Sequence, residues 1–202
     1  MGATLGILLA GGRGERLGLG SPKALVTLGG RTLLVRALET LRSFCDHVVV
    51  CAPASLELPI EPAIRVDDPL PGEGPLAALV AGLRSRPFAR AVALGVDMPF
   101  VGADALAIVC AGPMGAPAVV PAPGGRPQPL AAAYAPEAIA PLAVAVERGE
   151  RALVRAVLAL PARIVADAEL VAALGSTDAY FNLNTRADLA FAEGRIAAGL
   201  AR

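Results

Sequence analysis

Aromatic residues, histidine, cysteine and lysine are all scarce in this chain of 202 residues. Aromatic side chains make up 3% of the residues and tryptophan is absent, so a hydrophobic core must be built from Ala, Val, Leu and Ile. The single histidine, His47, argues against a Ser-His-Asp or Cys-His hydrolase and favours a structural or surface role. The odd number of cysteines, without a CxxC pair, argues against a zinc site. We expect the cysteines to be small buried hydrophobes in a reducing compartment: Cys45, Cys51 and Cys110.

Neither sign of charge is in excess, because 18 basic residues balance 18 acidic ones. The chain therefore has no electrostatic footprint for nucleic acid or an anionic membrane, and recognition of partners must be local. No basic-then-apolar signal peptide opens the sequence. The longest uncharged span, residues 105–125, contains four prolines and cannot form one membrane-spanning helix. We expect a soluble, cytoplasmic protein.

Apolar runs alternate with amphipathic helical segments over the first half of the chain. Leu34, Ala37, Leu38 and Leu41 recur at helical spacing, and Pro75 suits the first position of a second helix that runs to about Leu83. Strands are expected over residues 4–10, 48–52 and 90–96. These repeated units predict an α/β fold with a Rossmann-like, mostly parallel sheet and helices on both faces.

The pattern changes after Gly125. Residues 129–134 are interpreted as a strand, and two alanine-rich helical stretches follow up to about Leu160. Thr185 and Asp188 have the spacing of a capping box and predict the start of a C-terminal helix. Because no linker or repeat divides the sequence, residues 1–202 are expected to form a single domain.

A glycine-rich loop follows the first expected strand and contains Lys23, the only lysine of the chain. The loop is not a dinucleotide fingerprint, since Leu17 stands where the third glycine is required. It is not a P-loop either, because Lys23 lies between Pro22 and Ala24. Three cations beside exposed backbone amides favour a triphosphate ligand, and the alternative is a solvated surface loop. These cations are Arg13, Arg16 and Lys23.

Asp97 follows the strand expected over residues 90–96, at the edge of a parallel sheet where ligands collect. A carboxylate beside a triphosphate would be repelled unless a hard divalent cation lay between them, and Mg²⁺ fits that role. The alternative interpretation makes Asp97 the N-cap of a helix after Pro99.

These motifs resemble the signature of nucleotidyltransferases that activate small phosphorylated compounds, and among them most closely the molybdenum cofactor guanylyltransferase family. The resemblance rests on five blocks that run in order from about residue 5 to 190. They are Leu9-Ala10-Gly11-Gly12 with Arg16, Gly18, Lys23 and Leu28-Gly29-Gly30; Asp67-Asp68 with Gly74-Pro75-Leu76-Ala77; Val96-Asp97-Met98-Pro99-Phe100; Arg126-Pro127-Gln128-Pro129-Leu130 with Tyr134; and Phe181-Asn182-Leu183-Asn184-Thr185 with Asp188-Leu189.

The resemblance implies the nucleotide-diphospho-sugar transferase type of fold, with a nucleotide-binding half (about 1–100) and an acceptor-binding half (about 101–202). It implies transfer of GMP from GTP to the terminal phosphate of a molybdopterin-type cofactor, with Mg²⁺ as cofactor and transient contacts with proteins that deliver or accept the cofactor. Lys23, Arg16 and Asp97 would be catalytic, and Asp97 would also hold the metal. Asn182 and Asn184 would border the acceptor pocket. The nucleotide would contact Leu9, Ala10, Gly11, Gly12, Arg13, Lys23, Asp68 and Asp97.

Two positions depart from the family pattern. Cys51 stands where the family often has Asn after the second strand, and Ser21-Pro22 precedes the lysine where an acidic residue is common. Two alternatives therefore stay open. One is a cytidylyltransferase or sugar-phosphate nucleotidyltransferase of the same fold, and the other is a non-catalytic nucleotide-binding regulator.

Overall fold

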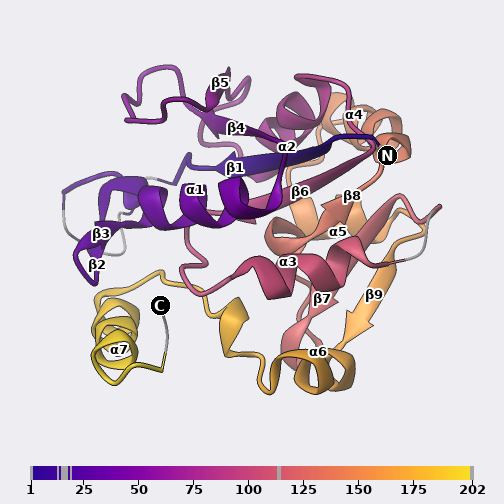
Figure 1. The fold of residues 1–202 in the computed structure, drawn as a ribbon. Coiled ribbons are helices and arrows are strands. Elements are labelled where there is room, and N and C mark those ends of the chain that lie inside the picture. The colour runs from indigo at the N-terminus through magenta and orange to yellow at the C-terminus, as the bar shows by residue number, and fades with distance from the viewer. Residues whose placement is uncertain (1, 13, 15–17, 19, 113–114, 201–202) are drawn as a thin grey trace.

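The computed structural model describes residues 2–12, 14, 18, 20–112 and 115–200. Its centre is a seven-stranded sheet in the order β5-β4-β1-β6-β8-β7-β9 (Figure 1). The short strand β8 pairs antiparallel with β6 and β7, and every other pair in this sheet is parallel, which confirms the predicted mostly parallel sheet. The strands are β1 (Thr4–Leu9), β4 (His47–Ala52), β5 (Ile64–Asp67), β6 (Arg90–Gly95), β7 (Ala118–Ala122), β8 (Ala133–Tyr134) and β9 (Arg163–Ala166).

Helices cover both faces of the sheet, as predicted (Figure 1). One face packs against α1 (Leu33–Phe44), α3 (Ala103–Cys110) and α6 (Asp167–Leu174). The other face packs against α2 (Pro75–Arg84), α4 (Ile139–Glu147) and α5 (Leu153–Leu158). A final helix, α7 (Arg186–Ala197), lies beside the two-stranded ribbon of β2 (Thr27–Leu28) and β3 (Arg31–Thr32).

The strand β1 shows why the sheet is buried on both sides. Leu5, Ile7 and Leu9 belong to the core beneath α2, α4 and α5, whereas Leu8 and Ala10 belong to the core beneath α1, α3 and α6. Successive side chains of a strand point to opposite faces, so a strand covered on both faces needs an unbroken apolar run. That requirement explains why the sequence revealed the central strands so clearly.

The prediction of a strand over residues 129–134 is wrong for most of these residues. Pro129–Ala131 forms a 3₁₀ turn, and only Ala133–Tyr134 pairs in the sheet. Proline has no N–H to give to a strand ladder, and the hydroxyl of Tyr134 donates to the carbonyl oxygen of Pro129 at 2.7 Å. The buried tyrosine thus holds the turn in place.

The C-terminal helix begins as predicted. The side chain of Thr185 accepts from the backbone N–H of Asp188, and the Asp188 carboxylate accepts from the backbone N–H of Thr185. None of the strands β2, β3, β5, β7 and β9 is predicted from the sequence, nor is helix α6, and a helix after Pro99, where α3 lies, enters only through the alternative interpretation of Asp97.

The scarce residues lie largely as expected. Cys51 is buried, and Cys45 and Cys110 are half-buried; all three are free thiols. Burial raises the pKa of the Cys51 thiol to about 12. His47 is exposed at the first position of β4.

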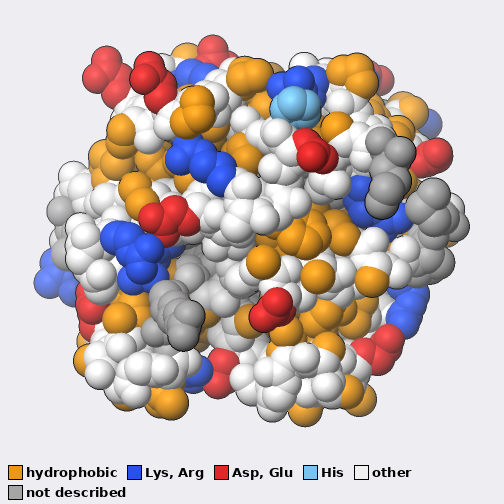
Figure 2. Space-filling model, viewed as in Figure 1, with side chains coloured by type: hydrophobic (Ala, Val, Ile, Leu, Met, Phe, Trp, Pro, Cys, Tyr) orange, Lys and Arg blue, Asp and Glu red, His pale blue; other side chains and the backbone are white. Residues whose placement is uncertain are grey.

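Basic and acidic side chains are interspersed on the face that carries α1 and α3, without a large patch of one sign (Figure 2). That distribution agrees with the balanced composition. Within the described residues, no helix has the length and apolar character needed to cross a membrane.

Candidate active site

A large cleft lies at the carboxyl ends of β1, β4 and β6. The chain passes from β1 to β4 and β5 on one side of the sheet, and then crosses back to β6 on the other side of β1. Such a reversal opens a crevice between the loops that follow the two central strands, where ligands of open α/β sheets bind. The cleft has a volume of about 1390 Å³, which is larger than most small-molecule sites. Its position therefore makes it the candidate active site.

Lys23 enters the cleft from the end of the glycine-rich loop. Its backbone N–H donates to the carbonyl oxygen of Gly12 at 3.2 Å, so the loop folds back on its own beginning. The side-chain Nζ donates to Oδ1 of Asn184 at 2.7 Å and lies 3.5 Å from Oδ2 of Asp97. Lys23 is only 9% exposed, yet its side chain lines the cleft. A single ammonium group is thus held between two oxygens at the point where the strand order reverses.

Asp97 is held beside the lysine by the end of β6. Its backbone carbonyl accepts from the N–H of Leu183 at 2.8 Å. A Cβ on Gly95, the last residue of β6, would lie 2.6 Å from Oδ1 of Asp97, so the carboxylate occupies space that only glycine leaves free. The alternative interpretation of Asp97 as a helix cap is wrong, because α3 begins at Ala103 with Gly102 as its N-cap.

Asp68 lies across the cleft from the glycine-rich loop. Its N–H donates to the carbonyl of Ala52 at 2.9 Å, and its Oδ1 accepts from the N–H of Leu70 at 3.0 Å. A Cβ on Gly11 would lie 3.8 Å from Oδ2 of Asp68. The same Cβ would lie 3.4 Å from Cδ of Pro53, so the Asp68 carboxylate lies close to the start of the glycine-rich loop, and both line the cleft.

Asn184 is fixed through the cap of α7. The Asp188 carboxylate accepts from the backbone N–H groups of Asn184 at 2.8 Å and Thr185 at 2.7 Å. The hydrogen bond from Asn184 is the largest of the causes that lower the pKa of Asp188. The Asp188 carboxylate therefore fixes the backbone of Asn184, and the side-chain Oδ1 of Asn184 accepts from Lys23.

The cleft brings together seven of the residues predicted to contact nucleotide, metal or acceptor: Leu9, Gly11, Gly12, Lys23, Asp68, Asp97 and Asn184. Ala10 is fully buried, and its N–H donates to the carbonyl of Cys51 at 2.9 Å, so its side chain does not line the cleft. Asn182 borders a separate hollow of about 560 Å³ together with Arg126 and Gln128. Arg13 and Arg16 lie outside the described residues.

Other cleft residues were not predicted as site residues, although Gly74-Pro75 stand in one of the family blocks and Cys51 was noted as a departure from the family pattern. Pro53 and Leu56 follow β4, and residues 71–75 form the wall that leads into α2. Cys51 also lines the cleft, and a Cβ on Gly82 of α2 would approach its Sγ to 2.9 Å. For Pro53, Leu56 and residues 71–73, only the expectation that loops gather at this edge of the sheet could have indicated a place in the cleft.

Comparison with known proteins connects this cleft to one family. The model of the MobA-like NTP transferase domain matches residues 6–165. The chain belongs to the MobA-like NTP transferase family. Membership makes it a nucleotidyltransferase, and the matched span includes the glycine-rich loop, Lys23, Asp68 and Asp97.

Individual relatives agree with the family match. A probable molybdenum cofactor guanylyltransferase of Chloroflexus aggregans is 35% identical over 161 residues, which cover 77% of this chain and 76% of the relative. The molybdenum cofactor guanylyltransferase of Desulfosudis oleivorans is 30% identical over 200 residues, which cover 98% of each chain. The crystal structure of molybdopterin-guanine dinucleotide biosynthesis protein A from Archaeoglobus fulgidus has a TM-score of 0.78 and 27% identity, covering 96% of this chain and 99% of that one.

Proposed function

We propose that this MobA-like NTP transferase transfers GMP from GTP to the terminal phosphate of a molybdopterin-type cofactor and releases pyrophosphate. The observation that carries the proposal is the juxtaposition of the Lys23 ammonium with Asp97 and Asn184 in the cleft between β1 and β6. The names of the relatives, which specify molybdenum cofactor guanylyltransferases, support the choice of donor and acceptor.

The chemistry needs little covalent help from the protein. An oxygen of the acceptor's terminal phosphate forms a bond to the α-phosphorus of GTP, while the bond from that phosphorus to the bridging oxygen of pyrophosphate breaks. Positioning and charge neutralisation supply most of the catalysis in such a reaction. Lys23 would stabilise negative charge near the α-phosphate, and the backbone of Gly11 and Gly12 would bind the polyphosphate.

The residues of the cleft fit a magnesium ion that is bound together with the nucleotide. Mg²⁺ in phosphate-transfer sites is held by one or two carboxylates, substrate phosphates and water. Asp97 supplies one partly exposed carboxylate on the cleft wall. Within the described ranges, no cluster of three or more His, Cys, Asp or Glu residues forms a metal cage of its own. Bound there, the ion would neutralise phosphate charge.

The acceptor would approach from the side of Asn182. Leu183 is fully buried, and the two asparagines on either side of it border neighbouring hollows, Asn184 the main cleft and Asn182 the smaller one. An acceptor that reaches from the smaller hollow toward Asp97 would bring its terminal phosphate to the nucleotide. Arg126 and Gln128 offer hydrogen-bond donors along that path.

The test combines nucleotide binding with product formation. With Mg²⁺ present, GTP should raise the thermal midpoint more than CTP, UTP or ATP does, because a ligand that binds only the folded state stabilises it in proportion to its affinity. Addition of purified molybdopterin cofactor should then release pyrophosphate. A larger shift with CTP would indicate a cytidylyltransferase, and a GTP shift without pyrophosphate release would indicate a regulator.

A further inference from the structure

The start of α7 contacts the glycine-rich loop at two points. Arg186, the first residue of the helix, donates from Nη2 to the carbonyl oxygen of Gly18 at 2.6 Å. Two residues earlier, Asn184 accepts from the Nζ of Lys23 at 2.7 Å. The loop that begins at the end of β1 is therefore attached to one short segment at its middle and at its end.

Gly18 is shaped for this contact. Its φ of +62° lies in the left-handed region that favours glycine. A Cβ on Gly18 would lie 3.2 Å from Nη2, 3.4 Å from Nε and 3.7 Å from Cζ of Arg186. The guanidinium group thus packs against Gly18 on the side where another residue would have its Cβ. It also donates to the Gly18 carbonyl oxygen.

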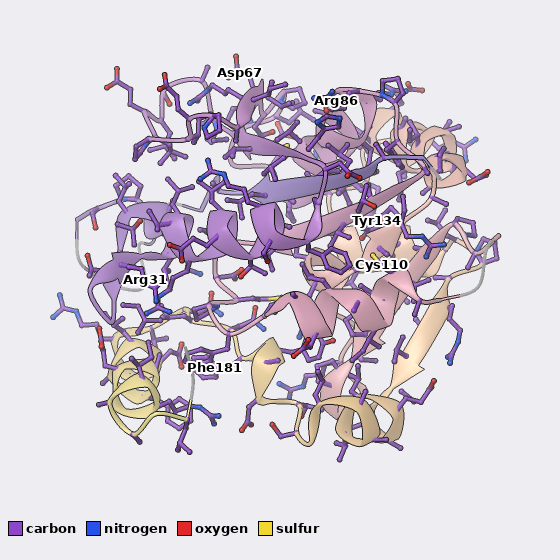
Figure 3. All side chains as sticks on the ribbon, in the orientation of Figure 1. Arg31, Asp67, Arg86, Cys110, Tyr134 and Phe181 are labelled. Atoms are coloured by element: carbon purple, nitrogen blue, oxygen red, sulfur yellow. The ribbon has the colours of Figure 1, made fainter. Side chains whose placement is uncertain are left out.

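The helix that carries Arg186 is itself well anchored. Thr185 and Asp188 form the reciprocal cap, and Leu183 is fully buried with its N–H bonded to the carbonyl of Asp97. Phe181, just before this segment, lies beside α7 (Figure 3) and stacks obliquely with Phe191 of that helix at 5.2 Å between ring centroids. A side chain at position 186 therefore extends from a fixed point toward the loop.

Helix stability does not explain an arginine at this position. The first turn of a helix carries a partial positive charge, so a cation there is unfavourable and an anion is preferred. A favourable contribution from arginine at the first helical position therefore has to come from a contact outside the helix. The hydrogen bond to Gly18 is such a contact.

We propose that Arg186 is a positioning residue, which holds the glycine-rich loop in the arrangement that receives the phosphates of the nucleotide. Arg186 contacts the loop at Gly18 and is not among the described residues that line the cleft. The proposal rests on the proposed function for the identity of the nucleotide, but the attachment of the loop can be measured without any nucleotide.

The variants are Arg186→Ala and Arg186→Lys, with Arg163→Ala as the matched control. Arg163 is an arginine on the edge strand β9 that pairs with Glu169 and does not line the cleft. Titration calorimetry gives the Kd of Mg·GTP, and limited trypsin digestion gives the rate of cleavage after Arg13 and Arg16 within the loop. The thermal midpoint of each variant reports its stability.

Arg186→Ala should weaken Mg·GTP binding about tenfold, the scale of one lost charged hydrogen bond, and should speed cleavage in the loop. Arg186→Lys keeps a charged donor and should lie between the alanine variant and wild type. Arg163→Ala should match wild type in both measurements. Because the arginine opposes the helix dipole, the alanine variant should keep its thermal midpoint.

Unchanged loop cleavage in Arg186→Ala would overturn the proposal, as would a fall in thermal midpoint that lysine does not rescue. If wild-type protein failed to bind Mg·GTP, the proposed function would be wrong, while the cleavage rates would still decide whether Arg186 holds the loop.

Discussion

At the scale of single residues, the contacts of Lys23 show why lysine fits position 23 better than arginine does. An ammonium is a compact charge on a flexible stem, whereas a guanidinium is a wide planar fork. Lys23 is almost completely buried between Asn184 and Asp97, and its Cδ would lie 3.5 Å from a Cβ on Gly12. A planar guanidinium at position 23 would not reproduce the contacts that the compact ammonium makes with Asn184 and Asp97, and at every other Lys or Arg position the chain has arginine.

Lys23→Arg should therefore lower kcat for the proposed guanylyl transfer by a factor on the order of 10², the scale set by losing one well-placed electrostatic group. The measurement is pyrophosphate release at saturating GTP and cofactor. The control is Arg31→Lys at the exposed pair of Arg31 with Glu39, where exchange of the cation should leave kcat unchanged. Near-normal turnover of Lys23→Arg would refute the argument from shape.

Asp97→Asn should reduce activity by a factor on the order of 10² and weaken its dependence on Mg²⁺, because an amide oxygen is a poorer ligand for a hard cation than a carboxylate. Titration of the initial rate with Mg²⁺ measures both effects. Asp104→Asn, at an exposed carboxylate in the first turn of α3, provides the control. An unaltered Mg²⁺ titration for Asp97→Asn would show that the carboxylate does not hold the metal.

At the scale of elements, the end of β6 decides where the Asp97 carboxylate lies. Gly95→Ala would place a Cβ 2.6 Å from Oδ1 of Asp97 and 3.3 Å from Cβ of Leu130. The Asp97 carboxylate can rotate away from this Cβ, so the variant should still fold. Activity should fall by at least about tenfold, which corresponds to about 1.36 kcal/mol of lost transition-state stabilisation. Steady-state kinetics and the thermal midpoint together test this outcome.

Gly194→Ala in α7 is the matched control for Gly95→Ala. A Cβ at Gly194 meets open space, and alanine favours a helix by up to about 1 kcal/mol over glycine. This variant should keep full activity and equal or greater stability. If Gly95→Ala also kept full activity, the position of the Asp97 carboxylate would not matter for turnover.

Elements were predictable where burial made their patterns simple. The central strands are unbroken apolar runs because a core covers each face, and α1 has apolar residues at helical spacing because one face packs against a core. By contrast, β5 and β9 lie at the two edges of the sheet and are only four residues long, with two charged residues in β5 and one in β9. The turn at Pro129–Ala131 depends on a hydrogen bond from Tyr134, a tertiary contact that strand propensity does not register.

The candidate site was predictable in part for a similar reason. Neighbouring parallel strands bring the glycine-rich loop and Asp97 to one edge, so their proximity follows from the fold class. The contact of Lys23 with Asn184 joins residues 161 positions apart, and that of Arg186 with Gly18 spans 168 positions. No local pattern encodes such contacts, and the family resemblance indicated Asn184 but not Arg186.

At the scale of the whole molecule, the core contains titratable groups that are neutral at physiological pH. Burial raises the pKa of Cys45 and Cys51 to about 12 and that of Cys110 to about 11. An unfolded chain loses these thiol protons near its ordinary pKa of about 8.5, before the folded chain does. The raised thiol pKa values therefore contribute their full share to the free energy of unfolding below the pKa of the unfolded chain. This contribution is lost as the pH rises toward 11 or 12.

The free energy of unfolding should accordingly decline as pH rises from about 9 to 11, with the steepest loss where only the unfolded state ionises. Urea unfolding under reducing conditions at several pH values measures the slope. A Cys45→Ala, Cys110→Ala double variant should show a shallower decline than wild type. Equal slopes for the two proteins would contradict the assignment of this dependence to the thiols.

Because Lys23 is the one lysine of the chain, a spectroscopic label on lysine would report from the cleft alone. Reductive methylation with ¹³C-formaldehyde modifies amines alone, so only Lys23 and the free α-amino group of the chain could carry the label. The dimethyl-lysine resonance would come from one known position, bounded by Asn184 and Asp97. Its chemical shift could follow nucleotide, metal and acceptor as each is added, without assignment of any other signal.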